Sequence, residues 1–90
     1  MSTTANVHKY DSFNATVIKE TISGCIVLLE LNAEEKASAF AFGNYSEGDR
    51  VFVTVTKVFD DGRIPRVAVD SVIAYAADME YDYSYYQYAA

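Results

Sequence analysis

Hydrophobic and polar side chains alternate along most of this chain, and a period of two predicts short β-strands rather than helices. The alternation is clearest in RVFVTVTKVF (50–59), where Val51, Val53 and Val55 share one face. Similar patterns in FNATVIKET, CIVLLEL, KASAFAF and RIPRVAVDSV predict four more strands. The five predicted strands are residues 13–21, 25–31, 36–42, 50–59 and 63–72.

Turn-forming residues separate these strands. Residues 32–35 and 43–49 read as loops, and DDG predicts a tight turn in which Gly62 takes a positive φ. Val58 is out of phase with the valines before it, which predicts a bulge or a bend. Pro65 cannot donate to a strand ladder, so it belongs at an edge, a strand start or a bulge.

Five short strands with hairpin-length connections predict an all-β domain, a small closed barrel over residues 10–72. A flat sheet of this size would leave one hydrophobic face bare. Residues 1–9 are predicted as a flexible N-terminus, and IAYAADME (73–80) is compatible with a short C-terminal helix. The alternation predicts that the core contains Val17, Val27, Leu29, Val51, Val53, Val55 and Val69.

The charge of the chain limits its partners. Its 90 residues, enough for one small domain, carry a formal net charge of −6. Between residues 7 and 72, ten acidic and seven basic residues leave a net charge of −3, and Asp78, Glu80 and Asp82 supply the rest. This balance argues against strong, nonspecific nucleic-acid binding, which needs an extended basic patch.

Residues suited to catalysis or metal binding are scarce. One cysteine and one histidine, His8, cannot supply three nitrogen or sulfur ligands, and there is no glycine-rich phosphate loop. Cys25 is predicted as a buried structural thiol, and Asp49 as a residue of a loop-to-strand junction. We therefore expect a protein that is not an enzyme and has no cofactor. Without an 18-residue apolar run or a secretory signal, the expected location is cytoplasmic, with no membrane contact.

Two stretches carry a family resemblance. GDRVFVTVTKVFDDGRI (48–64) resembles the fourth strand and following turn of the S1 domain, an OB-fold module common in RNA-binding proteins. NATVIKETISGCIVLL (14–29) is similar to the first hairpin of that family, in which a glycine starts the second strand. The resemblance covers roughly residues 10–72. It implies a five-stranded OB barrel that binds single-stranded RNA.

The family's RNA-binding positions are mostly altered in this chain. Ser23 and Ile26 stand where the family pattern has two aromatic residues. Phe40 stands in place of a histidine and Phe59 in place of an acidic residue, whereas Arg63 is kept. The resemblance therefore implies a changed RNA site, and we expect any RNA binding to be weak and salt-dependent.

The sequence leaves two functions open. In the first, the chain binds single-stranded RNA. Lys19, Lys57, Arg63 and Arg66 would contact phosphates, and Phe40, Phe42 and Phe59 would stack on bases.

In the second, it is an acidic protein-interaction module, of a kind that a phage or mobile element could encode. It would bind a protein partner or form a homodimer through exposed apolar residues. This predicted interface contains Ile26, Leu28, Phe40, Phe42, Phe52, Tyr85 and Tyr86. A basic stripe on the barrel would favour RNA, and a continuous apolar patch ringed by acidic residues would favour a protein.

The stretch YDYSYYQYAA (81–90) is half tyrosine. Four interpretations are open: stacking on bases, an Ala-Ala end like that of bacterial degradation tags, a frayed end, and a segment that packs on an apolar surface. Tyrosine buries a large area at low entropy cost, which favours packing. We therefore predict that Ile73–Tyr81 docks on the barrel and that the tyrosines beyond it are mobile until a partner or a second copy orders them.

Overall fold

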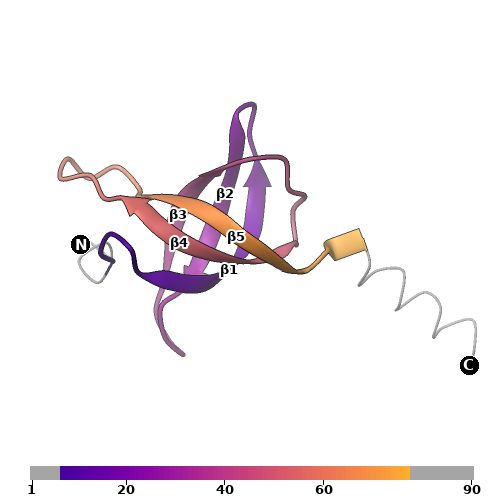
Figure 1. Cartoon of the computed structure of the whole chain (residues 1–90), viewed down its shortest axis with the longest axis horizontal. Helices are drawn as coiled ribbons and strands as arrows, with labels where there is room; N and C mark the ends of the chain where they lie inside the picture. The colour runs from indigo at the N-terminus through magenta and orange to yellow at the C-terminus, as the bar shows by residue number, and fades with distance from the viewer. Residues whose placement is uncertain (1–6, 78–90) are drawn as a thin grey trace, which may run out of the picture.

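Five strands close into a barrel in the computed structural model of this protein, which describes residues 7–77 (Figure 1). The strands are β1 (Ser12–Glu20), β2 (Gly24–Glu30), β3 (Lys36–Phe42), β4 (Arg50–Lys57) and β5 (Arg66–Ala74). Their order around the barrel is β1-β2-β3-β5-β4, with β4 returning to β1. Every pairing is antiparallel except β3 with β5. The protein is thus an all-β, OB-fold-like barrel, as the alternation predicts.

Inward-facing small and branched side chains fill the barrel. Alternate residues of β1 to β4 are buried, as the period-two pattern requires. Six of the seven predicted core residues are fully buried: Val17, Val27, Leu29, Val51, Val53 and Val55. The seventh, Val69, is only partly buried, so its assignment to the core is wrong.

The exposure of Val69 follows from the short contact between β3 and β5. The two strands pair only at Phe40↔Arg66 and Ala41↔Val67. Beyond Val67, no strand among the described residues covers that side of β5, and Val69 faces the opening.

Register shifts interrupt the β1–β2 ladder once and the β4–β5 ladder three times. Two of the extra residues lie on β5, at Asp70 and Ile73, and the other two lie on β1 and β4. The β1–β2 register shifts between Val17 and Lys19, which leaves Ile18 as the extra residue. The β4–β5 register shifts between Val55 and Lys57, which leaves Thr56 as the extra residue. The irregularity that the sequence predicts at Val58 therefore lies two residues earlier.

The β4–β5 connection is longer than predicted. β4 ends at Lys57 and β5 begins at Arg66, so Phe59 and Arg63 lie in a loop and not in strands. Gly62 has a φ of 90°, as the turn prediction requires. Pro65 is buried immediately before β5, and its carbonyl oxygen accepts a hydrogen bond from the Phe40 amide at 2.9 Å.

Both ends of the described region differ from prediction. Val7 is buried in the core and the Tyr10 amide donates to the Val55 carbonyl, so the chain packs on the barrel from Val7 onward, three residues before the predicted start of the barrel. Residues 1–6 of the predicted flexible N-terminus lie outside the described residues. At the other end, Ile73 and Ala74 belong to β5 and not to a helix. Ala76 and Ala77 are helical. The remainder of the predicted helix and the tyrosine-rich segment lie outside the described residues. No helix within residues 7–77 has the length and apolar character needed to cross a membrane.

Asp49 joins the β3–β4 connection to the end of β5. Its side chain is buried, and its two carboxylate oxygens accept hydrogen bonds from the Ser46 amide at 2.9 Å and the Ala76 amide at 2.8 Å. The predicted structural role of Asp49 is therefore confirmed, and the contact fixes the direction in which the chain leaves β5.

Candidate nucleic-acid interface

A row of paired residues runs across all five strands on the outer surface of the barrel. Lys19 pairs with Ile26, Ile26 with Phe40, Phe40 with Arg66, and Arg66 with Lys57. Directly paired residues project their side chains on the same side of a sheet. With strands about 4.8 Å apart, the row is about 19 Å long and has a cation at one end and two at the other.

The bulges on β1 and β4 bring Lys19 and Lys57, the two ends of the row, onto the outer surface. Val17 and Val55 point into the barrel, so in an unbroken alternation Lys19 and Lys57 would also point inward. The extra residues Ile18 and Thr56 reverse the alternation at these two places. Both lysines therefore lie on the outer surface beside Ile26 and Arg66.

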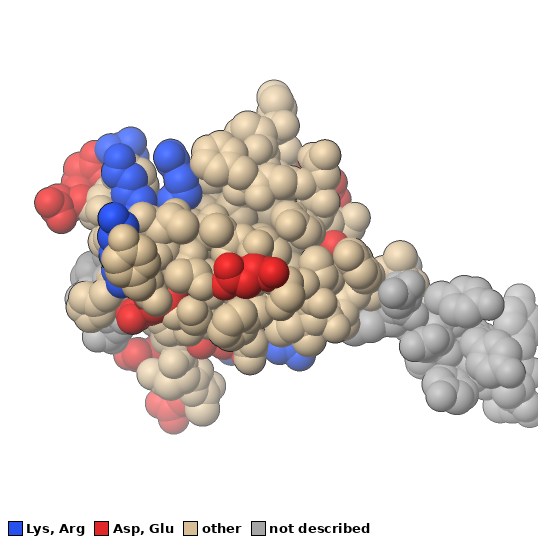
Figure 2. Space-filling view, in the orientation of Figure 1, with Lys and Arg blue, Asp and Glu red and all other residues tan. Residues whose placement is uncertain are grey.

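Three cations surround the ring of Phe59. The Arg63 guanidinium carbon lies 4.2 Å from the ring centroid, Lys57 Nζ lies 5.1 Å from it, and the Arg66 guanidinium carbon lies 5.5 Å from it. Cations within about 6 Å of a ring face are attracted by its quadrupole. Lys and Arg side chains gather at the end of the barrel where the β4–β5 loop lies (Figure 2).

The aromatic surface continues from this loop onto β3. Arg66 also lies over Phe42, 5.2 Å from the ring centroid, and Phe42 meets Phe40 edge to face at 5.0 Å. Phe42 is 56% exposed, whereas Phe40 is partly buried. A ring that is open to solvent beside a guanidinium is a suitable platform for a nucleic-acid base.

The charge of Arg63 is partly neutralised. Its Nε donates to an Asp61 carboxylate oxygen at 2.9 Å, and this hydrogen bond holds the pKa of Asp61 below its ordinary value. Among the described residues, Arg66 and Lys57 form no ion pair, so their charges are the ones available to a phosphate.

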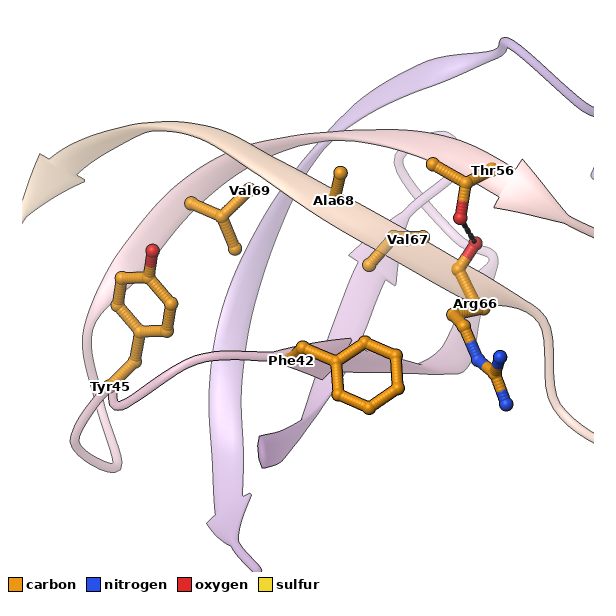
Figure 3. Close-up of a pocket in the computed structure, with 7 residues that line it drawn as sticks. All are labelled: Phe42, Tyr45, Thr56, Arg66, Val67, Ala68 and Val69. Carbon is orange, nitrogen blue, oxygen red and sulfur yellow. Dashed lines mark hydrogen bonds between the residues drawn. The ribbon is translucent and has the colours of Figure 1, made fainter. Parts of the chain in front are cut away.

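A groove of about 360 Å³ adjoins Arg66 where β3 and β5 separate. Figure 3 shows Phe42 and Tyr45 on one side of it and the side chains of β5 on the other. It is lined by Phe42, Tyr45, Thr56, Arg66, Val67, Ala68 and Val69.

Tyr45 is the lining residue that the sequence interpretation missed. The sequence pattern predicts only a loop over residues 43–49, yet Tyr45 is half-buried against the core and forms a wall of the groove. The signal available in the sequence was a single large aromatic residue in a short loop between Gly43 and Gly48.

Most of the predicted nucleic-acid residues therefore lie together, whereas Lys19 lies at the far end of a row that runs around the closed barrel. Six of the seven lie on β3, on β5 or at the β4–β5 loop, and Lys19 lies at the β1 end of the same row.

Three residues of the predicted protein interface, Ile26, Phe40 and Phe42, lie on or beside the same row, and two others lie apart from it. Leu28 lies between Thr16 and Ser38, and Phe52 lies between Asn14 and Ser71, on the side of the barrel made by β1, β4 and β5. Tyr85 and Tyr86 lie outside the described residues.

Within residues 7–77, no group of three or more His, Cys, Asp and Glu side chains is placed to hold a metal ion. Cys25 is fully buried, and burial, followed by the charges of Asp49 and Glu20, raises the pKa of its thiol. A buried, protonated thiol is a poor nucleophile, in keeping with the predicted structural role of Cys25.

Comparison with protein-family models, with curated proteins and with solved structures gives no significant match.

Proposed function

We propose that this protein is a non-enzymatic, S1-like OB module that binds single-stranded RNA weakly. The observation that carries the proposal is the cross-strand row of Lys19, Ile26, Phe40, Arg66 and Lys57, together with the cation-surrounded ring of Phe59 at its end. OB barrels bind single strands by combining a positive surface that follows the backbone with aromatic rings that stack on bases. Both parts occur here on adjoining strands.

The distribution of charge supports this function over the protein-interaction alternative. Four of the seven basic residues lie on the row or in the adjoining loop, although the described barrel is acidic as a whole. Phe52, which the alternative requires, has the polar neighbours Asn14 and Ser71. Phe52 is therefore separated by polar residues from the apolar residues of the row.

The same charges keep the affinity low. The row contains only three cations, Arg66, Lys57 and Lys19. Arg63, beside the row, already forms an ion pair with Asp61. Since few phosphates can be neutralised, we expect a dissociation constant above about 1 µM at physiological salt.

Titration of a fluorescein-labelled single-stranded RNA of about 12 nucleotides at low and at moderate salt tests the proposal. We expect the double variant Phe59→Ala, Arg66→Ala to bind more than about tenfold more weakly than the wild type, because it loses a stacking surface and a phosphate contact.

The matched control is Phe52→Ala, Lys36→Ala, which removes one aromatic and one basic residue outside the row and should bind as the wild type does. Equal RNA binding by the wild type and the Phe59, Arg66 double variant would place the site elsewhere. No binding by the wild type at low salt would refute the function.

A further inference from the structure

One edge of β5 has no partner strand over most of its length. Pairing with β3 stops at Ala41↔Val67, whereas pairing with β4 continues to Ala74. Within residues 7–77, the part of β5 from Ala68 to Ala74 is therefore paired on one side only, and its ladder with β4 has extra residues at Asp70 and Ile73. An unpaired edge presents a row of N–H and C=O groups to which another extended segment can add.

The groove lies beside this edge and is mainly apolar. Its walls are the rings of Phe42 and Tyr45 and the side chains of Val67 and Val69 (Figure 3). A segment that adds to the edge of β5 would place every second side chain over the groove. The groove therefore favours an occupant with large apolar or aromatic side chains at alternate positions.

The chain leaves the described region next to this edge. The Ala76 amide is held by Asp49, and the Ala76 side chain lies against Gly48, in the connection that also carries Tyr45. Residues 78–90 span up to about 43 Å when extended, and the free edge of β5 is about 23 Å long. These residues can therefore turn back and cover the whole edge.

The sequence of this segment fits the requirement. Tyr81, Tyr83 and Tyr85 alternate with Asp82 and Ser84, which is the period of a strand. Tyrosine is enriched in strands, residues 78–90 contain no proline or glycine, and residues 83–88 carry no charge. In a strand, the single charge of residues 81–88, on Asp82, lies on the face opposite Tyr81, Tyr83 and Tyr85, so the tyrosine face matches a groove lined by valine and aromatic side chains.

We propose that residues 81–88 pair with the open edge of β5 as a sixth, antiparallel strand and lay tyrosine rings in the groove. The pairing is antiparallel because the chain must reverse after Ala77 to run back along β5. The far end of the added strand reaches Arg66 and Phe42. It therefore competes with single-stranded RNA for these two residues, a consequence that rests on the proposed function.

Amide hydrogen exchange of the full chain, followed by NMR, tests the pairing. We expect slow exchange for amides of residues 81–88 and for the β5 amides that point away from β4 between Ala68 and Ala74. Tyr83→Pro should abolish this protection, because proline cannot donate to a ladder and disfavours pairing. Tyr83→Phe keeps the ring and the backbone donor and should leave the protection unchanged.

Fast exchange of these amides in the wild type would overturn the proposal. Protection that appears only on raising the protein concentration, together with a dimer by sedimentation, would also overturn it in favour of pairing with a second copy.

RNA titration of the same variants tests the competition separately. We expect Tyr83→Pro to bind RNA about 2- to 10-fold more tightly than Tyr83→Phe, since a competitor tethered at millimolar effective concentration lowers the fraction of free sites. Equal affinities would refute the competition and leave the exchange result to decide the pairing. If neither variant binds RNA, the proposed function is refuted. The exchange result would still decide whether residues 81–88 pair with β5.

Discussion

The ring of Phe40 lies across the backbone of Gly24 on the neighbouring strand, where a Cβ atom at position 24 would come within 2.8 Å of Phe40 Cζ. The same atom would collide with the carbonyl oxygen of Ala41. Glycine is thus required at the start of β2 because the paired strand approaches too closely for a side chain. It also leaves room for the Phe40 ring, which meets the exposed ring of Phe42 edge to face.

We expect Gly24→Ala to lower the free energy of unfolding by about 1–3 kcal/mol, the usual cost of adding a carbon where there is no space. Urea unfolding followed by circular dichroism measures this change. The neighbouring substitution Ser23→Ala, at an exposed turn residue, should change stability by less than about 0.5 kcal/mol. A Gly24→Ala variant as stable as the wild type would contradict the close approach of β2 and β3.

Val53 and Val69 form a matched pair for testing the core, since they lie directly opposite each other on β4 and β5. Val53 is fully buried, whereas Val69 borders the groove. We expect Val53→Ala to cost about 2–3 kcal/mol and Val69→Ala about 1 kcal/mol or less, because only the first leaves an enclosed cavity. Denaturant unfolding of both variants checks the difference. Equal costs would mean that Val69 is as enclosed as the sequence pattern predicts.

Alternation was sufficient to predict the five strands and most of the core, because inward and outward positions differ in polarity along each strand. It could not predict where Val69 would lie, since its burial depends on how far β3 pairs with β5. That length is a property of two strands that are distant in sequence. The assignment failed at the point where the barrel opens into a groove.

The sequence supplies the candidate site residues, but it does not show how they are arranged in space. The bulges at Ile18 and Thr56 decide that Lys19 and Lys57 face outward, and neither residue has a special backbone requirement that marks a bulge. The stacking of Arg66 between Phe42 and Phe59 depends on a loop conformation. Such relationships arise from register, which a single sequence specifies only through the completed fold.

Asp49 provides a test of the contact that directs the C-terminal segment. Asp49→Ala removes a buried carboxylate and leaves the Ser46 and Ala76 amides without the acceptors of two partly buried hydrogen bonds. Hydrogen bonds to charged groups contribute about 1.5–3 kcal/mol each, so we expect a loss of at least 2 kcal/mol. We also expect faster exchange of the Ala76 amide. Asp49→Asn, which keeps one acceptor oxygen, should lose less stability than Asp49→Ala, and the reverse order would contradict this role.

Cys25 should make the stability of the barrel depend on alkaline pH. Its thiol pKa is raised above the ordinary value of 9.0, mainly by burial. The unfolded chain therefore loses this proton at lower pH than the folded chain. The contribution of Cys25 is complete below the unfolded pKa and is lost as the pH rises from about 9 toward the folded pKa.

We expect the wild type to lose more stability than Cys25→Ala between about pH 8 and about pH 10. Denaturant unfolding of both proteins across this range measures the difference, and the tyrosines and lysines common to both cancel. Parallel losses would show that the thiol has the same pKa in the folded and unfolded chains.

The last prediction separates charge from stacking at the RNA interface. Arg66 has no ion pair among the described residues, and it lies over Phe42 and near Phe59. If it neutralises one phosphate, Arg66→Gln should reduce the slope of log affinity against log salt by about 0.7, the value for one contact on a single strand. Phe59→Leu removes a stacking surface but no charge, so it should lower affinity by about 1 kcal/mol or more with the slope unchanged.

Lys36→Gln, which removes a cation opposite Glu30 and away from the row, should alter neither quantity. Titrations at four or more salt concentrations give both the affinity and the slope for each variant. A slope that falls for Lys36→Gln as much as for Arg66→Gln would show that RNA responds to the total charge of the barrel and not to the row.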